Sequence, residues 1–174
     1  MREDYLGDSY DLVKRVWCQT LRDIAALYAH PRFVPQELPT KYTAVTGIPI
    51  LQSAHESSFG ILLDPHTGIP LPQESVHKAT ASHAPLPFIV AMNEELHPAY
   101  VVCFDQSYHR AGGLTRQQQR SDKREFLSKR GVLSFYYVSH APFLFAATKI
   151  EILEAIHTRL MSVGIPECRF ERDP

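Results

Sequence analysis

The chain has 174 residues and a net charge of -1, and one hydrophobic core commonly serves a chain of this length. Apolar residues make up 44% of it and charged residues 21%, which is typical of folded globular proteins and excludes the disordered and fibrous classes. The near-neutral charge also argues against a protein that binds nucleic acid mainly through electrostatics. We therefore predict a single domain over residues 1–174.

The N-terminal sequence and the cysteines predict the cellular setting. Acidic residues stand where a signal peptide would be basic and then apolar, and no apolar run approaches the roughly 20 residues that cross a bilayer. Cys18, Cys103 and Cys168 are far apart and form no CxxC pair. Buried, reduced thiols are the plain interpretation. We expect a cytoplasmic protein that has no membrane partner.

Two different segments begin the chain. Asp8 or Ser9 can cap a helix that continues to about His30, since apolar residues recur there at helical spacing and a proline follows. Residues 31–58 contain four prolines and are predicted to be irregular, with a short edge strand at 43–51. So long an irregular segment suggests a lid or a contact with the second subunit of a homodimer.

The rest of the chain alternates between strand and helix patterns. Short apolar runs predict strands at 59–63, 100–104, 132–138 and 143–147, and helices are expected at 87–97, 115–130 and 148–163, with a last edge strand at 167–170. A helix between two strands makes them parallel, whereas a four-residue link makes the next strand antiparallel. We predict an α/β fold in which a mixed, mostly parallel sheet of about five strands has helices on both faces.

Polar residues follow two of these predicted strands. Asp105, Ser107 and His109 come after the strand at 100–104, and Ser139 with His140 follows the next one. If the two strands are adjacent, Asp105 lies about 5 Å from His140 at the backbone and could orient its imidazole. Asp105, His140 and His109 are thus candidate catalytic residues, and Ser107 and Ser139 candidate substrate-binding residues. In the alternative interpretation, the same residues only cap turns.

The same edge of the sheet could collect ligands for a divalent metal. Asp64 also follows a predicted strand, so Asp64, Asp105 and His140 form a candidate set of oxygen and nitrogen ligands. Their spacing matches no established metal motif, and Asp-Pro is also a common turn former.

The helix at 115–130 and the loop before it are rich in basic residues. Arg110 and Arg116, next to a helix N-terminus, are candidate clamps for a phosphorylated small molecule or a nucleotide. A solvated helix with paired charges is the alternative. The sequence lacks the GxGxxG and GxxxxGK[ST] motifs that hold nucleotide cofactors.

Two functions remain open at this point. The first is a hydrolase or transferase that acts on a phosphorylated or nucleotide-like substrate at the carboxyl edge of the sheet. The second is a non-catalytic ligand-binding or oligomerisation module, in which residues 31–58 and the aromatic residues near 135–145 provide an interface. A pocket that brings the candidate residues together would favour the enzyme.

Overall fold

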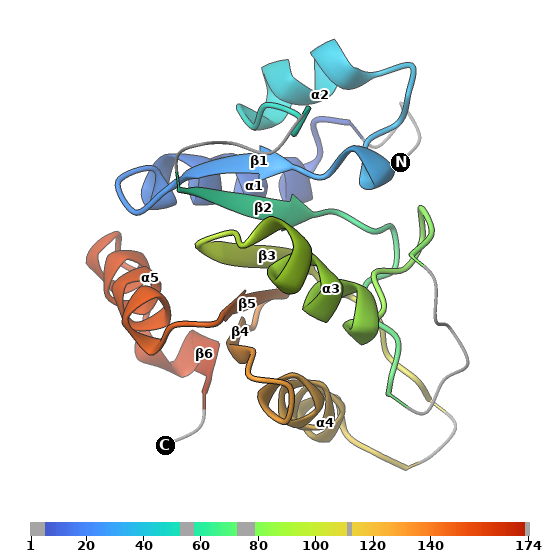
Figure 1. The fold of residues 1–174 in the computed structure, drawn as a ribbon, viewed down its shortest axis with the longest axis vertical. Coiled ribbons are helices and arrows are strands. Elements are labelled where there is room, and N and C mark those ends of the chain that lie inside the picture. The colour runs from blue at the N-terminus through green and yellow to red at the C-terminus, as the bar shows by residue number, and fades with distance from the viewer. Residues whose placement is uncertain (1–5, 53–57, 73–78, 111–112, 173–174) are drawn as a thin grey trace.

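A six-stranded sheet forms the centre of the fold (Figure 1). The computed structural model describes residues 6–52, 58–72, 79–110 and 113–172. Along the sheet the strands lie in the order β1-β2-β3-β5-β4-β6. Their bounds are Ala26–Ala29 for β1, Phe59–Leu63 for β2, Tyr100–Phe104 for β3, Leu133–Tyr137 for β4, Phe143–Ala147 for β5 and Phe170–Glu171 for β6.

The sheet is mixed, as predicted, but antiparallel pairs predominate among the described strands. The pairs β1·β2 and β2·β3 are parallel, whereas β3·β5, β4·β5 and β4·β6 are antiparallel. The prediction of a mostly parallel sheet was therefore wrong. The reason is that β5 folds back from β4 as a hairpin and takes the place next to β3. Strands β3 and β4 still run in the same direction, but β5 lies between them.

Helices cover both faces of this sheet, as predicted. On one face α1 (Ser9–Leu21) and α5 (Ile150–Ser162) pack on a core that contains Trp17, Val102 and Phe104. On the other face α3 (Leu86–Leu96) and α4 (Arg116–Ser128) pack on a second core around Val101 and Cys103. In Figure 1, α1 lies behind the strands and α3 in front of them. Alternate residues of β3 thus supply opposite cores, because successive side chains of a strand point to opposite faces.

The first helix is shorter than predicted. Asp8 caps α1 by accepting hydrogen bonds from the backbone N–H groups of Tyr10 and Asp11, but the helix ends at Leu21 and a strand follows at Ala26–Ala29. Residues 26–29, predicted as part of one long helix that continues to about His30, therefore form β1. A run of four residues is too short for its periodicity to separate strand from helix.

Residues 31–58 are more regular than predicted. A 3-10 helix spans Pro31–Phe33, and α2 spans Pro39–Thr46, with proline in its first turn and Gly47 at φ 74° ending it. The predicted edge strand is reduced to a single bridge between Ile50 and Ala29. Residues 53–57 lie outside the described residues, so the description of this segment stops short of its end.

The C-terminal half follows the sequence closely. The predicted helix at 115–130 is α4, and Thr115 and Gln118 form a capping box at its start, whereas Lys149 precedes α5 without a side-chain cap. The predicted edge strand at 167–170 is mostly wrong, because a 3-10 helix spans Glu167–Arg169 and β6 covers only Phe170–Glu171. Among the described residues, no helix has both the length and the apolar character needed to span a membrane.

Candidate functional site

Asp64 and Asp105 follow adjacent parallel strands but point to opposite faces of the sheet. Leu63 of β2 lies opposite Cys103 of β3, so Asp64 is level with Phe104 and Asp105 lies one residue further on. The pleat then directs Asp64 towards the α1 face and Asp105 towards the α4 face. Each carboxylate is buried in its own network of polar side chains.

The Asp105 network joins β3 to α4 and β4. Oδ2 of Asp105 accepts hydrogen bonds from Lys123 Nζ at 2.8 Å and from Tyr136 OH at 2.7 Å. Oδ1 accepts from the backbone N–H of Ile69 at 2.9 Å and from the N–H and hydroxyl of Ser107. Lys123 Nζ also donates to Ser107 Oγ at 2.8 Å. One buried ammonium thus balances one buried carboxylate, and both hold Ser107 in place.

The local sequence explains how this network forms. Gly68 lies so close to Asp105 that a Cβ atom there would overlap Oδ1 and lie 2.7 Å from the Asp105 Cα, and its φ of +128° also favours glycine. Burial raises the pKa of Tyr136 well above its usual value, and the charge of Asp105 adds to the effect. The phenol therefore remains a proton donor to the carboxylate.

The Asp64 network has similar residues but a different charge. Lys14 Nζ of α1 lies 2.6 Å from Asp64 Oδ2 and 2.8 Å from Asp11 Oδ1. Tyr42 of α2 donates its hydroxyl hydrogen to Asp64 Oδ2 at 3.2 Å. Among the described residues, two carboxylates therefore share one ammonium, and this cluster has an excess negative charge.

The excess negative charge helps to raise the pKa values of Asp64 and Lys14. Burial raises the pKa of Asp64, and the charge of Asp11 adds to the rise although Lys14 opposes it. Burial alone would lower the pKa of Lys14, but the charges of Asp64 and Asp11 more than reverse it, so that this pKa is also raised. Both groups hold their protons more tightly than they would in water.

A small pocket opens beside the Asp105 network. It has a volume of about 130 Å³ and is lined by Thr67, Pro70, Leu71, His83, Ser107, Tyr108, His109 and Gln119. Gln119 fixes the loop by donating to the carbonyl of His109 at 2.7 Å and accepting from its N–H at 3.0 Å. Ser107 therefore links the buried Lys123 to this pocket, which His109 also lines.

The two predicted arginine clamps are exposed near this pocket. The guanidinium carbon of Arg116 lies 5.1 Å from the centroid of the Tyr108 ring, in the range of a cation-π contact. Arg110 follows His109 in the exposed loop. Other basic residues of α4 turn inward, since Arg120 binds Glu171 through two hydrogen bonds of 2.7 and 2.6 Å.

His140 and Ser139 are not part of this site. The exposed His140 ring lies 5.7 Å from the ring of Tyr10, and the hydroxyl of Ser139 exchanges 3.0 Å hydrogen bonds with the backbone of Ala141. His140 lies in the turn between β4 and β5, and its backbone carbonyl accepts a 3.5 Å hydrogen bond from Nε2 of Gln106, the residue after Asp105. Asp105 bonds Lys123 and Tyr136 in place of an imidazole.

The candidate metal ligands are also separated. The described residues include no group of three or more His, Cys, Asp or Glu side chains that could hold a metal ion, so Asp64, Asp105 and His140 do not form one site. Opposite faces of the sheet separate the two aspartates, and lysine and tyrosine donors occupy their oxygens.

Sequence reasoning missed the buried partners of the two aspartates. None of the four partners was predicted to bind a carboxylate, and Tyr136 was among the aromatic residues considered for an interface. The four are Lys14, Lys123, Tyr42 and Tyr136. For Lys123, the sequence did contain a signal, the low apolar content of residues 115–130. A helix with so few apolar residues can pack on a sheet only if it also buries polar side chains, and buried polar side chains need partners.

Comparison with known proteins adds no relatives. No protein-family model matches the chain, and no curated protein or solved structure matches it.

Proposed function

We propose that the pocket beside Ser107 binds a phosphate group and that the protein is a hydrolase or transferase for a phosphorylated or nucleotide-like substrate. The observation that carries the proposal is the position of Ser107, half-buried on the pocket wall and 2.8 Å from the buried Lys123 ammonium. A bound phosphate oxygen would accept the Ser107 hydroxyl hydrogen in place of Asp105 Oδ1. A hydroxyl donor with a cation behind it stabilises negative charge, which is the main requirement of phosphoryl transfer.

His109 and His83 are the proton-transfer candidates in this proposal, since both line the pocket. Histidine exchanges protons near neutral pH and can activate a water or protonate a leaving oxygen. Asp105 takes the role of a positioning residue instead of a base, because donors from Lys123, Tyr136 and the 69 and 107 backbones occupy its oxygens.

The size of the pocket limits how much of a substrate can enter it. Its volume of about 130 Å³ is below the roughly 300–1,000 Å³ of pockets that enclose a whole ligand. One end of the substrate would therefore enter, and the remainder would lie outside against Tyr108 and Arg116. A planar base could stack on the exposed Tyr108 ring, and Arg116 and Arg110 would face further phosphates.

A non-catalytic binding module is the second candidate, and one observation favours it. Both buried aspartates are saturated by hydrogen-bond donors, as expected of carboxylates whose main role is to hold elements together. In that case the pocket would bind a ligand without turnover.

Ligand-induced stabilisation and turnover separate these candidates. We would measure the Tm with inorganic phosphate and with adenine nucleotides, and the release of p-nitrophenol from p-nitrophenyl phosphate, for wild type, Ser107→Ala and His109→Asn. The matched controls are Ser162→Ala and His97→Asn, in α5 and at the end of α3.

The proposal expects phosphate to raise the Tm and His109→Asn to lower turnover by about 10²- to 10⁴-fold. Ser107→Ala should weaken both responses, and the control variants should retain them. Binding without turnover would favour the binding module. If no phosphate compound shifts the Tm, the phosphate site is wrong.

A further inference from the structure

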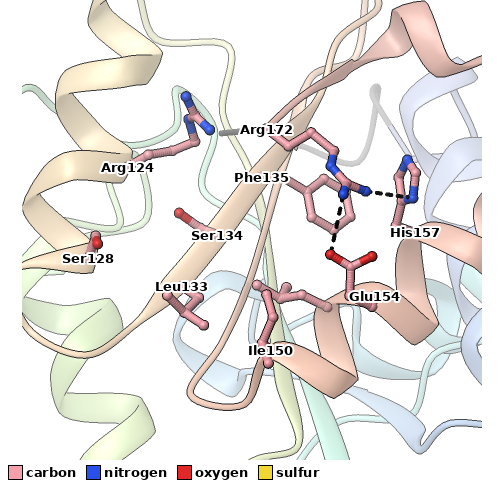
Figure 2. A pocket seen from close by; sticks show the side chains of 10 residues that line it. Arg124, Ser128, Leu133, Ser134, Phe135, Ile150, Glu154, His157 and Arg172 are labelled. Atoms are coloured by element: carbon pink, nitrogen blue, oxygen red, sulfur yellow. Dashed lines mark hydrogen bonds and ion pairs between the residues drawn. The ribbon is translucent and has the colours of Figure 1, made fainter. Parts of the chain in front are cut away.

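A cavity of about 280 Å³, which we call the edge cavity, lies beside the first half of β4 and between α4 and α5 (Figure 2). Its lining includes Leu133, Phe135, His157 and Arg172. Arg172 follows β6 directly and belongs to the segment 167–172, which contains a 3-10 helix and β6. The contacts that hold Arg172 against α5 therefore shape one wall of this cavity.

Two hydrogen bonds orient the guanidinium of Arg172, and Figure 2 shows both as dashed lines. Nη1 lies 2.8 Å from His157 Nδ1, and Nη2 donates to Glu154 Oε1 at 3.3 Å. A guanidinium has donors and no acceptor, so His157 Nδ1 must accept the first hydrogen bond. An imidazole nitrogen accepts only while it carries no proton. The contact with Arg172 therefore requires the neutral ring of His157, with its hydrogen on Nε2.

The ring of His157 also contacts the rest of the segment 167–172. Nε2 lies 2.9 Å from Glu167 Oε2, a distance typical of an ion pair, although the two atoms lack the alignment of a hydrogen bond. The ring packs edge-on against Phe170, with 4.7 Å between the centroids, and against Phe135 of β4 at 6.0 Å. One titratable side chain of α5 thus touches the segment at its beginning, its middle and its end.

A second proton on His157 would change these contacts in opposite directions. The new N–H at Nδ1 would point at Nη1 of Arg172, and two donors cannot share a hydrogen bond. The Glu167 contact would instead become a pair of opposite charges. The other charged residues that line the edge cavity are Glu154, which stays available to Arg172, and Arg124 on the α4 side. The remaining ring contacts, from β4 and β6, are with uncharged phenylalanines.

We propose that His157 is a proton-controlled clasp for Arg172. With the neutral ring, Arg172 is held by His157 and Glu154 and forms the wall of the edge cavity. With the charged ring, His157 pairs with Glu167, and Arg172 leaves Nδ1 and keeps only Glu154. The wall therefore opens as the pH falls through the range in which histidine takes up a proton, about pH 5–8.

The change is confined to the end of the segment, because β6 has other anchors. It pairs with Tyr136 and Tyr137 of β4, and Arg120 binds Glu171 through two hydrogen bonds. Neither His157 nor Arg172 lines the pocket beside Ser107, so this inference is independent of the proposed function.

An NMR titration tests the clasp. We would follow the nitrogen signals of the His157 ring and of the Arg172 guanidinium from about pH 8 to pH 5. The ring should begin as the tautomer with its hydrogen on Nε2, and the Arg172 signals should shift at the same pH at which the ring gains its second proton. The guanidinium of Arg169 is the internal control and should not shift with the ring, because it donates to the backbone carbonyl of Val138.

Variants assign the effect to the His157 ring. His157→Asn keeps an acceptor near the position of Nδ1 but has no group that titrates in this range, so its Arg172 signals should stay constant. His97→Asn, at the end of α3, is the matched control and should titrate as wild type does. Retained far-UV circular dichroism shows that each variant is folded, and the wild-type titration decides the question even if His157→Asn is not.

Three results would overturn the inference. The first is a neutral His157 ring with its hydrogen on Nδ1 at pH 8. The second is an Arg172 guanidinium whose signals stay constant while the ring gains its second proton. The third is the same shift of the Arg172 signals in wild type and in folded His157→Asn.

Discussion

The Asp105 and Asp64 networks are built from the same residue types at the ends of adjacent strands, yet they differ in charge and in access. Each has an aspartate after a strand, a lysine from a helix and a tyrosine that donates to the carboxylate. The Asp105 network is charge-balanced and reaches a pocket through Ser107. The Asp64 network has a second carboxylate, Asp11, in place of the serine, and all its side chains are buried.

The comparison shows which features of the two networks are structural and which point to a functional site. An aspartate at the carboxyl end of a strand joins helices to the sheet in both networks, so its position alone does not mark a site. The Asp105 network presents a polar group, the Ser107 hydroxyl, to a pocket, whereas the described side chains of the Asp64 network are buried. The unfolding free energies of matched variants test whether the two networks also differ in how much they stabilise the fold.

The largest effect is expected when the shared lysine of the Asp64 network is removed. Lys14→Met would leave Asp11 and Asp64 buried together without a cation, whereas Lys123→Met leaves only Asp105. Breaking one buried pair costs about 3–5 kcal/mol, so we expect Lys14→Met to lose about 5 kcal/mol and Lys123→Met about 3 kcal/mol of unfolding free energy. Urea denaturation measures both, with the exposed Lys129→Met as control. A smaller loss for Lys14→Met would contradict the charge difference between the networks.

Asp105→Asn should come next in size. The variant keeps the shape of the side chain but leaves the Lys123 ammonium, 1% exposed, without a counter-charge. We expect a loss of about 3 kcal/mol, read from the urea midpoint at pH 7. An unchanged midpoint would show that Lys123 loses its proton or finds another partner.

Gly68→Ala tests the close packing around Asp105. The new Cβ would overlap the carboxylate, and a φ of +128° is strained for any other residue, so we expect a loss of about 2–3 kcal/mol. Gly131→Ala is the matched control, since its φ is +75° but no atom lies within 4 Å of the added Cβ. It should lose only about 1 kcal/mol. Equal losses in thermal unfolding would mean that backbone strain alone accounts for Gly68.

Asp64→Asn should have the smallest effect, about 1 kcal/mol, because Lys14 retains Asp11 as a partner. What distinguishes this variant is the pH dependence of its unfolding free energy. Since the pKa of Asp64 is raised in the folded protein, the folded state binds more protons than the unfolded state above the ordinary aspartate pKa. Stability therefore falls as pH rises through that window.

The pH dependence can be measured by urea denaturation at several pH values between about 4 and 7. We expect Asp64→Asn to lose the part of the slope that Asp64 contributes, and Asp23→Asn, at an exposed ion pair, to keep the wild-type slope. An identical slope in wild type and Asp64→Asn would contradict the raised pKa.

Local sequence patterns predicted most of the elements but not all of their partners. Strands 59–63, 100–104 and 143–147 and the capped helix at 115–130 were confirmed because their apolar runs and caps are complete within the segment. Strand β1 and helix α2 were missed. The first is only four residues long, and the prolines around the second also suit a loop.

The candidate site was predicted in part. Asp105, Ser107 and His109 do gather at the carboxyl end of β3, because five consecutive residues hold them together. Asp105 does not orient the His140 imidazole, because the fold places β5 beside β3 and brings Lys123 and Tyr136 to Oδ2 of Asp105 instead. No local pattern specifies that choice.

The sequence by itself determined an α/β chain with polar residues after its central strands, since side-chain periodicity and capping act within a few residues. The tertiary structure decided which faces Asp64 and Asp105 occupy and which lysine balances each of them. Lys14 pairs across 50 residues and Lys123 across 18. Such partners are selected when packing removes water from the charges, because a buried carboxylate is stable only beside the cation that the fold brings to it.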